Sequence, residues 1–364
     1  MKISQLDKMG VTLSKLGFGC MRFPNIDNVI VQDEVDKMIK YAHDNGINYF
    51  DTAYVYGGGN SEIALGKALK QLNREDFYVT DKMPLWVAKN EEDLDIIFDK
   101  ALERLQLDYI DFYLLHALDN SVYEKIINYN VIDWAKKKIA EGKIKHLGFS
   151  MHDDYDFLVK VLDLYDFEFV QIQLNYLDII DRPGLKGYEE LEKRNIPVII
   201  MEPLKGGLLS DLNDNIAAPF RELGGSNVSY AFRWLAEKKG IATILSGMSS
   251  MAQLKQNIEV FKNLSPLTEE ENEAILKVEK NVIKLQKVKC TGCGYCMPCP
   301  FGVTIPELFK AWNTKSMNQS TNWISGTDIN YEIAEKCRNC KKCVRLCPQH
   351  INIPQMLRQL VSEK

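Results

Sequence analysis

The fold is decided around the stretch INYFDTAYVYG, residues 47–57. It begins as a short apolar run, which is the pattern of a buried strand. The run ends at an acid, Asp51, and the chain then turns through three consecutive glycines at 57–59. Ser61 is the expected N-cap of the helix that follows. An acid at a strand end, before a loop that carries Tyr56, predicts chemistry at the carboxyl ends of parallel strands.

Short apolar runs alternate with amphipathic segments along most of the chain. After a hairpin in residues 1–13, strands are expected at 14–21, 48–52, 77–82, 110–116, 144–150, 169–175, 197–201 and 242–246. Helices are expected at 33–45, 62–72, 91–106, 131–141, 155–164, 188–194, 228–238 and 253–261. Eight strand–helix units in about 250 residues is the count of a TIM (β/α)8 barrel. The alternative, an open doubly wound sheet, needs a Gly-x-Gly-x-x-Gly turn that the residues GFGCMR after the first strand do not continue.

The length and charge of the chain limit the classes of function that it can have. The 364 residues favour two domains, and 46% hydrophobic residues suffice for a large core. A net charge of −5 argues against a nucleic-acid or anionic-membrane partner. No apolar stretch is long enough to span a membrane, and residues 1–7 lack the apolar core of a signal peptide. We therefore expect a cytoplasmic α/β protein.

The composition changes after Leu264, which divides the chain into three expected parts. Residues 1–264 form the barrel, a charged linking helix occupies 265–287, and a smaller domain follows at 288–364. The smaller domain is a two-fold repeat of CTGCGYCMPCP (290–300) and CRNCKKCVRLCP (337–348), each followed by an Ile-Pro helix start. Eight of the nine cysteines lie here, which in a reducing compartment favours metal ligation over disulfides.

The cysteine spacing is that of iron–sulfur proteins. Cys-x2-Cys-x2-Cys-x3-Cys-Pro is the bacterial ferredoxin run for a [4Fe–4S] cluster; the second run matches it and the first is one residue short. Paired zinc sites are the alternative, although these usually use separated Cys-x2-Cys knuckles. In two-cluster ferredoxins the fourth cysteine of each run ligates the other cluster. The expected ligand sets are therefore Cys290, Cys293, Cys296 and Cys347 for one cluster and Cys337, Cys340, Cys343 and Cys299 for the other, in a mainly helical ferredoxin-like domain.

Chemically matched groups stand at successive strand ends of the expected barrel. Asp51 and Tyr56 follow the second strand, and Lys82, His116 and Ser150 end the next three. A free phenol has a pKa of roughly 10, and an adjacent ammonium lowers it by stabilising the phenolate. A carboxylate fixes the lysine, and a neutral histidine can orient a carbonyl oxygen toward the phenol. Together these groups predict an acid–base site that protonates an oxyanion as hydride arrives.

At this point the sequence resembles the aldo-keto reductase superfamily. The matching text is GINYFDTA at 46–53, YG at 56–57, SExxLG at 61–66, the Lys82 segment and YLLH at 113–116. The resemblance covers roughly residues 1–262. It implies a TIM barrel, a nicotinamide cofactor, a small-molecule carbonyl substrate and a catalytic tetrad of Asp51, Tyr56, Lys82 and His116, with Tyr56 as proton donor. The tail resembles the branch of that superfamily with a C-terminal dicluster ferredoxin module.

The resemblance also implies cofactor-binding positions, NADP or NAD being the cofactor. They are Gly19, Cys20, Met21, Ser150, His152, Gln171, Met201, Glu202, Leu204, Gly206, Gly247, Ser249, Gln253 and Asn257. His152 stands where the family places Asn, and Met201 where many members place an aromatic. The basic residues that usually hold a 2′-phosphate are replaced, and Lys255 is the only nearby cation expected from the sequence. NADP is favoured on family grounds alone.

Two functions stay open. The first is an NAD(P)H-dependent carbonyl reductase that carries two [4Fe–4S] clusters. The second is an electron-transfer protein in which the clusters couple the barrel site to a redox partner protein. Hydride carries two electrons whereas a cluster passes one, so the second function needs a converter such as a flavin. The segments 117–130 and 208–227 are expected to be loops with no recognisable substrate code.

Overall fold

The computed structural model describes residues 1–180, 182–317 and 329–364. Internal contacts divide the chain into two units, Met1–Pro203 with Phe232–Pro266, and Leu204–Ala231 with Leu267–Lys364. Each unit is described by itself. In the described part of the chain, no helix has the length and apolar character that a membrane crossing requires.

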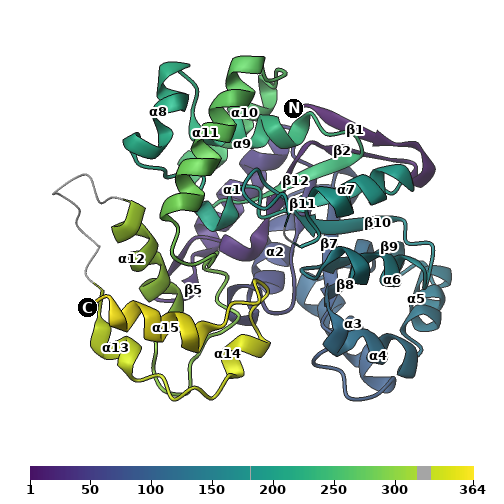
Figure 1. Ribbon diagram of the computed structural model, residues 1–364. Coiled ribbons are helices and arrows are strands. Elements are labelled where there is room, and N and C mark those ends of the chain that lie inside the picture. The colour runs from purple at the N-terminus through teal and green to yellow at the C-terminus, as the bar shows by residue number, and fades with distance from the viewer. Residues whose placement is uncertain (181, 318–328) are drawn as a thin grey trace. The chain divides into compact units, whose positions relative to one another are not determined.

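Eight parallel strands of the first unit close into a barrel, which confirms the predicted TIM architecture (Figure 1). In sequence they are β3 (Leu16–Gly19), β6 (Tyr49–Asp51), β7 (Tyr78–Met83), β8 (Ile110–Leu118), β9 (Ile144–Met151), β10 (Phe169–Gln173), β11 (Val198–Met201) and β12 (Ile241–Gly247). Strand neighbours follow chain order and β12 closes onto β3. All eight carboxyl ends therefore lie at one end of the barrel.

Helices connect the strands and bury one apolar face each. Figure 1 shows α3 to α7 along the outside of the strands. The helices of the barrel are α1 (Gln32–Asp44), α2 (Ser61–Leu69), α3 (Glu92–Leu105), α5 (Val131–Ala140), α6 (Tyr155–Leu162), α7 (Gly184–Lys193), α9 (Asn227–Ala236) and α10 (Met251–Lys262). In α1 the side chains of Val35, Met38, Ile39 and Ala42 form one apolar face, which is fully buried.

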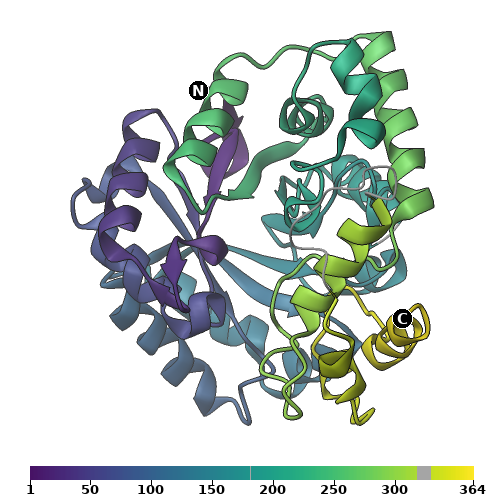
Figure 2. The same cartoon turned by 90° about the vertical axis from the view of Figure 1, so that its left-hand side faces the viewer.

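An N-terminal hairpin closes the end of the barrel opposite the strand carboxyl ends. Strands β1 (Ile3–Leu6) and β2 (Val11–Ser14) pair as the predicted hairpin. The turn between them, η1 (Asp7–Met9), ends at Gly10, whose φ is 66°. Leu13 packs among Tyr49, Phe112 and Phe169 from the start of three barrel strands. Figure 2 shows the purple hairpin near the label N. Each buried aromatic or leucine side chain contributes about 1.5–3 kcal/mol of transfer free energy.

Three local predictions were wrong. Ser61 is the first residue of α2 rather than its N-cap, because its hydroxyl donates to the carbonyl of Cys20 (3.0 Å) and lies 2.9 Å from the hydroxyl of Thr52. The expected loop at 117–130 contains α4 (Asn120–Asn128), capped by Asp119. The expected loop at 208–227 contains α8 (Asp214–Glu222), capped by Asn213.

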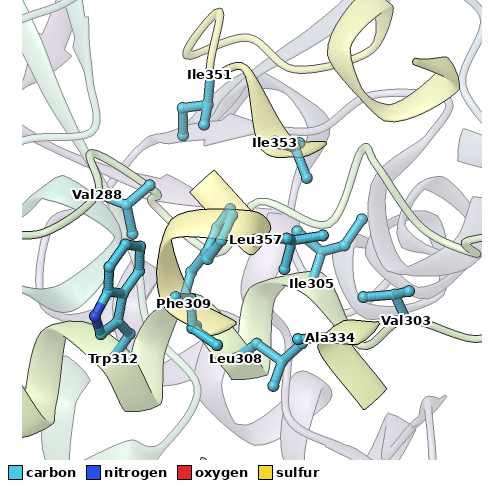
Figure 3. Close-up of a cluster of buried hydrophobic side chains, with 11 residues drawn as sticks. Val288, Val303, Ile305, Leu308, Phe309, Trp312, Ala334, Ile351, Ile353 and Leu357 are labelled. Atoms are coloured by element: carbon cyan, nitrogen blue, oxygen red, sulfur yellow. The ribbon is translucent and has the colours of Figure 1, made fainter. Parts of the chain in front are cut away.

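The second unit is mainly helical, as predicted. It contains α11 (Glu269–Leu285), which starts at a capping box of Thr268 and Glu271, and then α12 (Ile305–Met317), α13 (Tyr331–Glu335), α14 (Lys342–Arg345) and α15 (Ile353–Ser362). Figure 3 shows its core, in which Phe309 and Trp312 of α12 meet Leu357 of α15. Six half-buried cysteines pack against this core, namely Cys290, Cys296, Cys299, Cys337, Cys343 and Cys347. The cysteine loops are thus held by two helices, one from each repeat.

Candidate functional site

A buried ion pair joins the ends of β6 and β7. Lys82 Nζ donates to Asp51 Oδ1 (2.7 Å) and to the carbonyl of Thr52 (2.7 Å), and the two side chains are only 1% and 3% exposed. Burial raises the pKa of Asp51, and the charge of Lys82 offsets part of this effect. With a carboxylate and a carbonyl as acceptors, the ammonium position is fixed.

The phenol and the imidazole of the predicted tetrad lie next to this pair. Lys82 Nζ is 4.8 Å from the centroid of the Tyr56 ring, and the His116 ring is 6.1 Å from the same ring at an angle of 86°. Tyr56 opens the turn η3 (Tyr56–Gly59), in which Gly57 and Gly58 take φ of 57° and 65° that only glycine adopts readily. The structure therefore brings all four predicted catalytic residues together.

His116 is held neutral. Burial, followed by the charges of Lys82 and His152, lowers its pKa well below the ordinary value of a histidine. The Trp86 ring lies 4.9 Å from it. The next residue, Ala117, has φ of 48°, and its N–H donates to Ser150 Oγ (2.8 Å). Ser150 thus stabilises the strained turn that positions the imidazole.

A polar chain runs along the ends of β9 and β10. His152 Nδ1 lies 3.3 Å from Gln173 Oε1, and Gln173 Nε2 donates to Asp178 Oδ2 (2.7 Å). Asn175 Nδ2 donates to the same carboxylate oxygen (2.9 Å) and to the carbonyl of Glu202 (3.0 Å). Neither Gln173 nor Asp178 was predicted as a site residue, although Gln173 ends a strand next to the predicted Gln171 and could have been included on that ground.

Gln171 offers a buried group to a ligand. Its side chain is 1% exposed, and its Nε2 donates only a long contact to the sulfur of Met201 (3.8 Å). Its Oε1 accepts no hydrogen bond from any residue that the structure describes. A buried amide oxygen normally has a donor, and a ligand with an amide N–H₂, such as a nicotinamide carboxamide, would supply one. These residues fit the cofactor that the sequence predicts.

The ends of β3 and β12 form the other side of the site. Gly19 pairs with both Asp51 and Gly247, and a Cβ on it would lie 3.4 Å from the Gly247 nitrogen. Cys20, which with Met21 opens the turn η2 (Cys20–Arg22), is fully buried, and burial raises the pKa of its thiol well above the ordinary value. Burial therefore disfavours the thiolate, which is the nucleophilic form of a cysteine.

Arg22 is a cation that the sequence analysis missed. A Cβ added to Gly247 would lie 3.2–3.3 Å from the Cβ, Cγ and Cδ atoms of Arg22. The Arg22 side chain therefore runs across that glycine. The expectation that Lys255 is the only nearby cation is therefore wrong. Lys255 lies 5.5 Å from the ring centroid of Tyr41 on α1. Arg22 lies three residues after Gly19, which pairs with Gly247. Once β3 is known to pair with β12, Arg22 is expected near Gly247.

Ser249, Gln253 and Asn257 meet at the start of α10. Gln253 Oε1 accepts the Ser249 N–H (2.7 Å), while Ser250 Oγ accepts the Gln253 N–H (3.3 Å) as the N-cap. Asn257 Nδ2 donates to Ser246 Oγ (2.9 Å) inside the protein. These three predicted residues therefore also shape the loop between β12 and α10.

The loop after β11 is strained. Glu202 and Lys205 adopt left-handed φ of 55° and 46° without being glycine. Leu204 and Gly206 belong to the second unit, where Gly206 has φ of 67° and a Cβ on it would lie 2.0 Å from the carbonyl oxygen of Thr291. Only glycine fits at 206, because the backbone between Cys290 and Cys293 packs directly against it.

A further buried acid lies beside the catalytic lysine in the chain. Asp81 is fully buried, and neither of its carboxylate oxygens accepts a hydrogen bond from a described residue. Burial, and then the negative charge of Glu62, raise the pKa of Asp81 well above its ordinary value. Glu62 is itself held by Arg104, which donates to both of its oxygens (2.5 and 3.0 Å). Asp81 therefore keeps its proton at pH values where an exposed aspartate has lost it.

We expect Asp81→Asn to stabilise the protein, by an amount that grows with pH. The unfolded chain loses the Asp81 proton near pH 3.9 whereas the folded chain keeps it, so wild-type stability falls as the pH rises above about 4, by up to about 1.4 kcal/mol per pH unit. Asparagine removes this penalty. Anaerobic urea unfolding at a series of pH values from about 4 to about 8 measures the difference. Asp133→Asn, whose carboxyl is 78% exposed, is the matched control. A gain that does not change with pH would contradict a protonated Asp81.

The eight cysteines of the tail gather into two sets that cross the two runs. Burial raises the pKa of the Cys296 thiol to about 12, and the next contributions come from Cys293, Cys290 and Cys347. Burial also raises the pKa of Cys343, with further contributions from Cys337, Cys340 and Cys299. Such charge effects weaken as the distance between the groups grows. The fourth cysteine of each run therefore lies beside the first three of the other.

The first set surrounds a pocket. Its four cysteines line this pocket together with Ile305, Phe309, Ile351 and Ile353. No three or more His, Cys, Asp or Glu side chains among the described residues are arranged around a single metal ion. Four thiolates from crossed runs in an apolar setting fit a [4Fe–4S] cluster, in which each iron takes one cysteine.

Comparison with known proteins agrees with this geometry. The aldo/keto reductase family model matches residues 15–280, and a 4Fe-4S dicluster domain model matches residues 289–351. L-galactose dehydrogenase of Arabidopsis thaliana is 28% identical over 308 residues, which is 77% of this chain and 96% of that protein. A solved aldo-keto reductase of Bacillus halodurans, in its holo form, is 25% identical with a TM-score of 0.64 over 76% of this chain and 96% of its own. The chain therefore belongs to the aldo/keto reductase family and carries a 4Fe-4S dicluster domain in its C-terminal part.

Proposed function

We propose that the barrel reduces an aldehyde or ketone with NAD(P)H and that Tyr56 donates the proton. The observation that carries this proposal is the buried Lys82–Asp51 pair, whose ammonium lies 4.8 Å from the centroid of the Tyr56 ring beside a neutral His116. The four groups have the chemistry and the proximity that protonation of an oxyanion requires.

Each of the four residues would have a separate role in the reaction. Bound reduced nicotinamide supplies hydride to the carbonyl carbon. The His116 imidazole donates a hydrogen bond to the carbonyl oxygen and orients it. Tyr56 gives its phenolic proton to that oxygen, and the Lys82 ammonium stabilises the phenolate that remains. Asp51 holds Lys82 in place, and water restores the Tyr56 proton, so that one hydride and one proton convert the carbonyl to an alcohol.

We propose NADP(H) as the cofactor, with NAD(H) as the alternative. Gln171 would accept a hydrogen bond from the carboxamide, since its buried Oε1 needs a donor. The glycines at 19 and 247 let the ends of β3 and β12 and the Arg22 side chain lie close together. Arg22, which crosses Gly247, is the cation best placed for a cofactor phosphate.

Replacement of this arginine tests the cofactor assignment. Arg22→Gln is expected to raise the Kd of NADPH about ten-fold or more, because a charge-assisted hydrogen bond to phosphate contributes about 1.5–3 kcal/mol. Loss of NADPH affinity alone places Arg22 at the 2′-phosphate, and an equal loss for NADH places it at the pyrophosphate. Fluorescence titration measures both constants, with Lys255→Gln as the control. Unchanged affinity for both cofactors would remove Arg22 from the site.

We further propose that the tail holds two [4Fe–4S] clusters in the crossed sets given above. The crossed charge effects on Cys296 and Cys343 support this assignment. None of the nine cysteines, all of which lie in the described part of the chain, forms a disulfide, and keeping eight of them reduced until iron binds suits a cytoplasmic location.

One anaerobic experiment tests the reaction. The purified protein is mixed with NADPH, and the cluster absorbance is followed before and after an aldehyde is added. Oxidation of NADPH only in the presence of the aldehyde, with no change in the cluster spectrum, supports a carbonyl reductase. Bleaching of the clusters by NADPH alone would instead support the coupled electron-transfer alternative. A panel of aldehydes and ketones then gives the substrate class.

A further inference from the structure

The two cysteine runs differ in charge although they bind equivalent clusters. Residues 288–364 contain ten Lys or Arg and five Asp or Glu, hence a net charge of +5 in a chain whose net charge is −5. Half of these cations lie in or directly before the second run, and all five are exposed: Lys336, which precedes the run, and Arg338, Lys341, Lys342 and Arg345 within it. No acidic residue occurs between Lys336 and Ser362. We call these five side chains the basic rim.

The basic rim has no intramolecular partner in the part of the chain that the structure describes. None of its five side chains forms an ion pair with a described residue, whereas Lys287 and Lys364 of the same unit pair with Glu363 and Glu335. Exposed cations that are not neutralised within the chain attract an external anion.

Neutralisation of the clusters' own charge does not explain the rim. A [4Fe–4S] cluster with four thiolates carries the same charge in either set, so this explanation predicts equal numbers of cations around both runs. The first run is flanked only by Lys287 and Lys289, and Lys287 is already paired with Glu363. The excess of positive charge is therefore specific to the second run.

The second run also holds the most accessible thiol. Cys340 is the exposed cysteine, whereas Cys290, Cys293, Cys296 and Cys299 of the first run are all partly buried. Lys341 and Asn339, on either side of Cys340, adopt left-handed φ of 60° and 54°, which turns the loop tightly around it. Within the same unit, the backbone at Thr291 of the first run packs against Gly206, in the loop that follows β11. The loop that would hold the second cluster thus has a thiol exposed to solvent, whereas the loop that would hold the first packs against another loop of the same unit.

We propose that the basic rim is the docking surface of a small acidic one-electron carrier protein, which exchanges electrons with the cluster held by Cys337, Cys340, Cys343 and Cys299. The rim supplies the charge complementarity that steers such a carrier, and the exposed Cys340 supplies a short path to the cluster. In this exchange the reduced carrier loses one electron, the oxidised cluster gains it, and no proton moves and no bond forms. The inference depends on the second cluster and is independent of the reaction in the barrel.

The test uses the full-length protein with its clusters and an acidic bacterial flavodoxin as the probe. Calorimetry measures flavodoxin binding over a range of salt concentrations, and stopped-flow spectroscopy follows conversion of flavodoxin hydroquinone to its semiquinone. Lys342→Glu/Arg345→Glu reverses two rim charges on α14. Lys277→Glu/Lys280→Glu makes the same change, with the same spacing, at exposed sites on α11 of the same unit.

The rim variant is expected to bind flavodoxin about ten-fold or more weakly and to slow semiquinone formation in proportion, whereas the α11 variant stays within about two-fold of wild type. Iron content and the visible spectrum must equal those of wild type, and Lys342→Gln/Arg345→Gln replaces the rim variant if they do not. An equal loss in both variants would overturn the proposal, since only total charge would matter. Absence of flavodoxin binding, or tighter binding of single-stranded DNA or of anionic phosphatidylglycerol vesicles, would overturn it as well.

Discussion

Tyr56→Phe is expected to lower kcat for carbonyl reduction by about 10²- to 10⁴-fold, which is the contribution of a positioned general acid. The change removes one oxygen atom and leaves the ring that lies 4.8 Å from Lys82 Nζ and 6.1 Å from the His116 ring. The geometry of the site should therefore survive while the transferable proton is lost. Steady-state rates with a fixed aldehyde and saturating NADPH measure the effect.

Binding separates this result from a general disruption of the site. The Kd of NADPH for the Tyr56→Phe protein should stay within about two-fold of wild type, because the residues that would hold the cofactor belong to other strand ends. Tyr54→Phe is the matched control. Tyr54 lies in the same loop, its side chain is 38% exposed, and its ring is covered by Arg104 at 5.3 Å. Full activity of the Tyr56 variant, or an equal loss in the Tyr54 variant, would defeat the assignment of the proton donor.

The pH dependence of the wild-type rate bears on the same assignment. His116 has a pKa well below that of an ordinary histidine, because it is buried and faces Lys82 and His152. Its protonation should therefore not limit the rate between about pH 6 and pH 8. A wild-type kcat that falls as the pH is lowered from about 8 to about 6 would contradict a neutral His116.

The barrel and the tetrad could be predicted because both follow from order along the chain. Apolar runs of strand length alternate with helical periodicity, and parallel strands bring their carboxyl ends to one edge. Asp51 ends β6, and Lys82 and His116 lie near the carboxyl ends of β7 and β8. Neighbouring strands follow chain order, so the meeting of these residues required no knowledge of side-chain packing. Of the cofactor-binding positions implied by the resemblance, Gly247 ends β12, whereas Gln171 lies in the middle of β10 and Gln173 ends that strand.

The features that could not be predicted depend on which groups each side chain contacts in the folded protein. Ser150 Oγ accepts a hydrogen bond from the Ala117 N–H, and Asn257 Nδ2 donates one to Ser246 Oγ. Neither contact can be read from the spacing of these residues in the sequence. The helix α8 was missed because Pro219 and a polar surface weaken its pattern, whereas its buried face is defined by contact with α11 and by the stacking of Phe220 on Tyr230. Arg22 was missed because its neighbour Gly247 is more than two hundred residues away in the chain.

The second large effect concerns the fourth cysteine of each run. If each cluster takes its fourth ligand from the other run, then Cys296 and Cys347 serve one cluster, and Cys343 serves the other. Cys296→Ala/Cys347→Ala should then remove a single cluster, so that anaerobically purified protein keeps about four of about eight irons per chain. Cys343→Ala/Cys347→Ala, which alters two cysteines of one run, should remove both clusters and leave almost no iron.

The reverse pattern is required if each run holds its own cluster. In that arrangement the pair in one run would damage one cluster, and the pair taken from both runs would damage two, so iron analysis alone distinguishes the two connectivities. The structure favours the crossed arrangement because Cys347 adds its charge to Cys296, and Cys299 to Cys343. Crossing also explains the fold of the domain. Each cluster then joins the loop before α12 to the loop before α15, and the side chains of these two helices share one core. Loss of either cluster should therefore also lower the melting temperature of the whole domain.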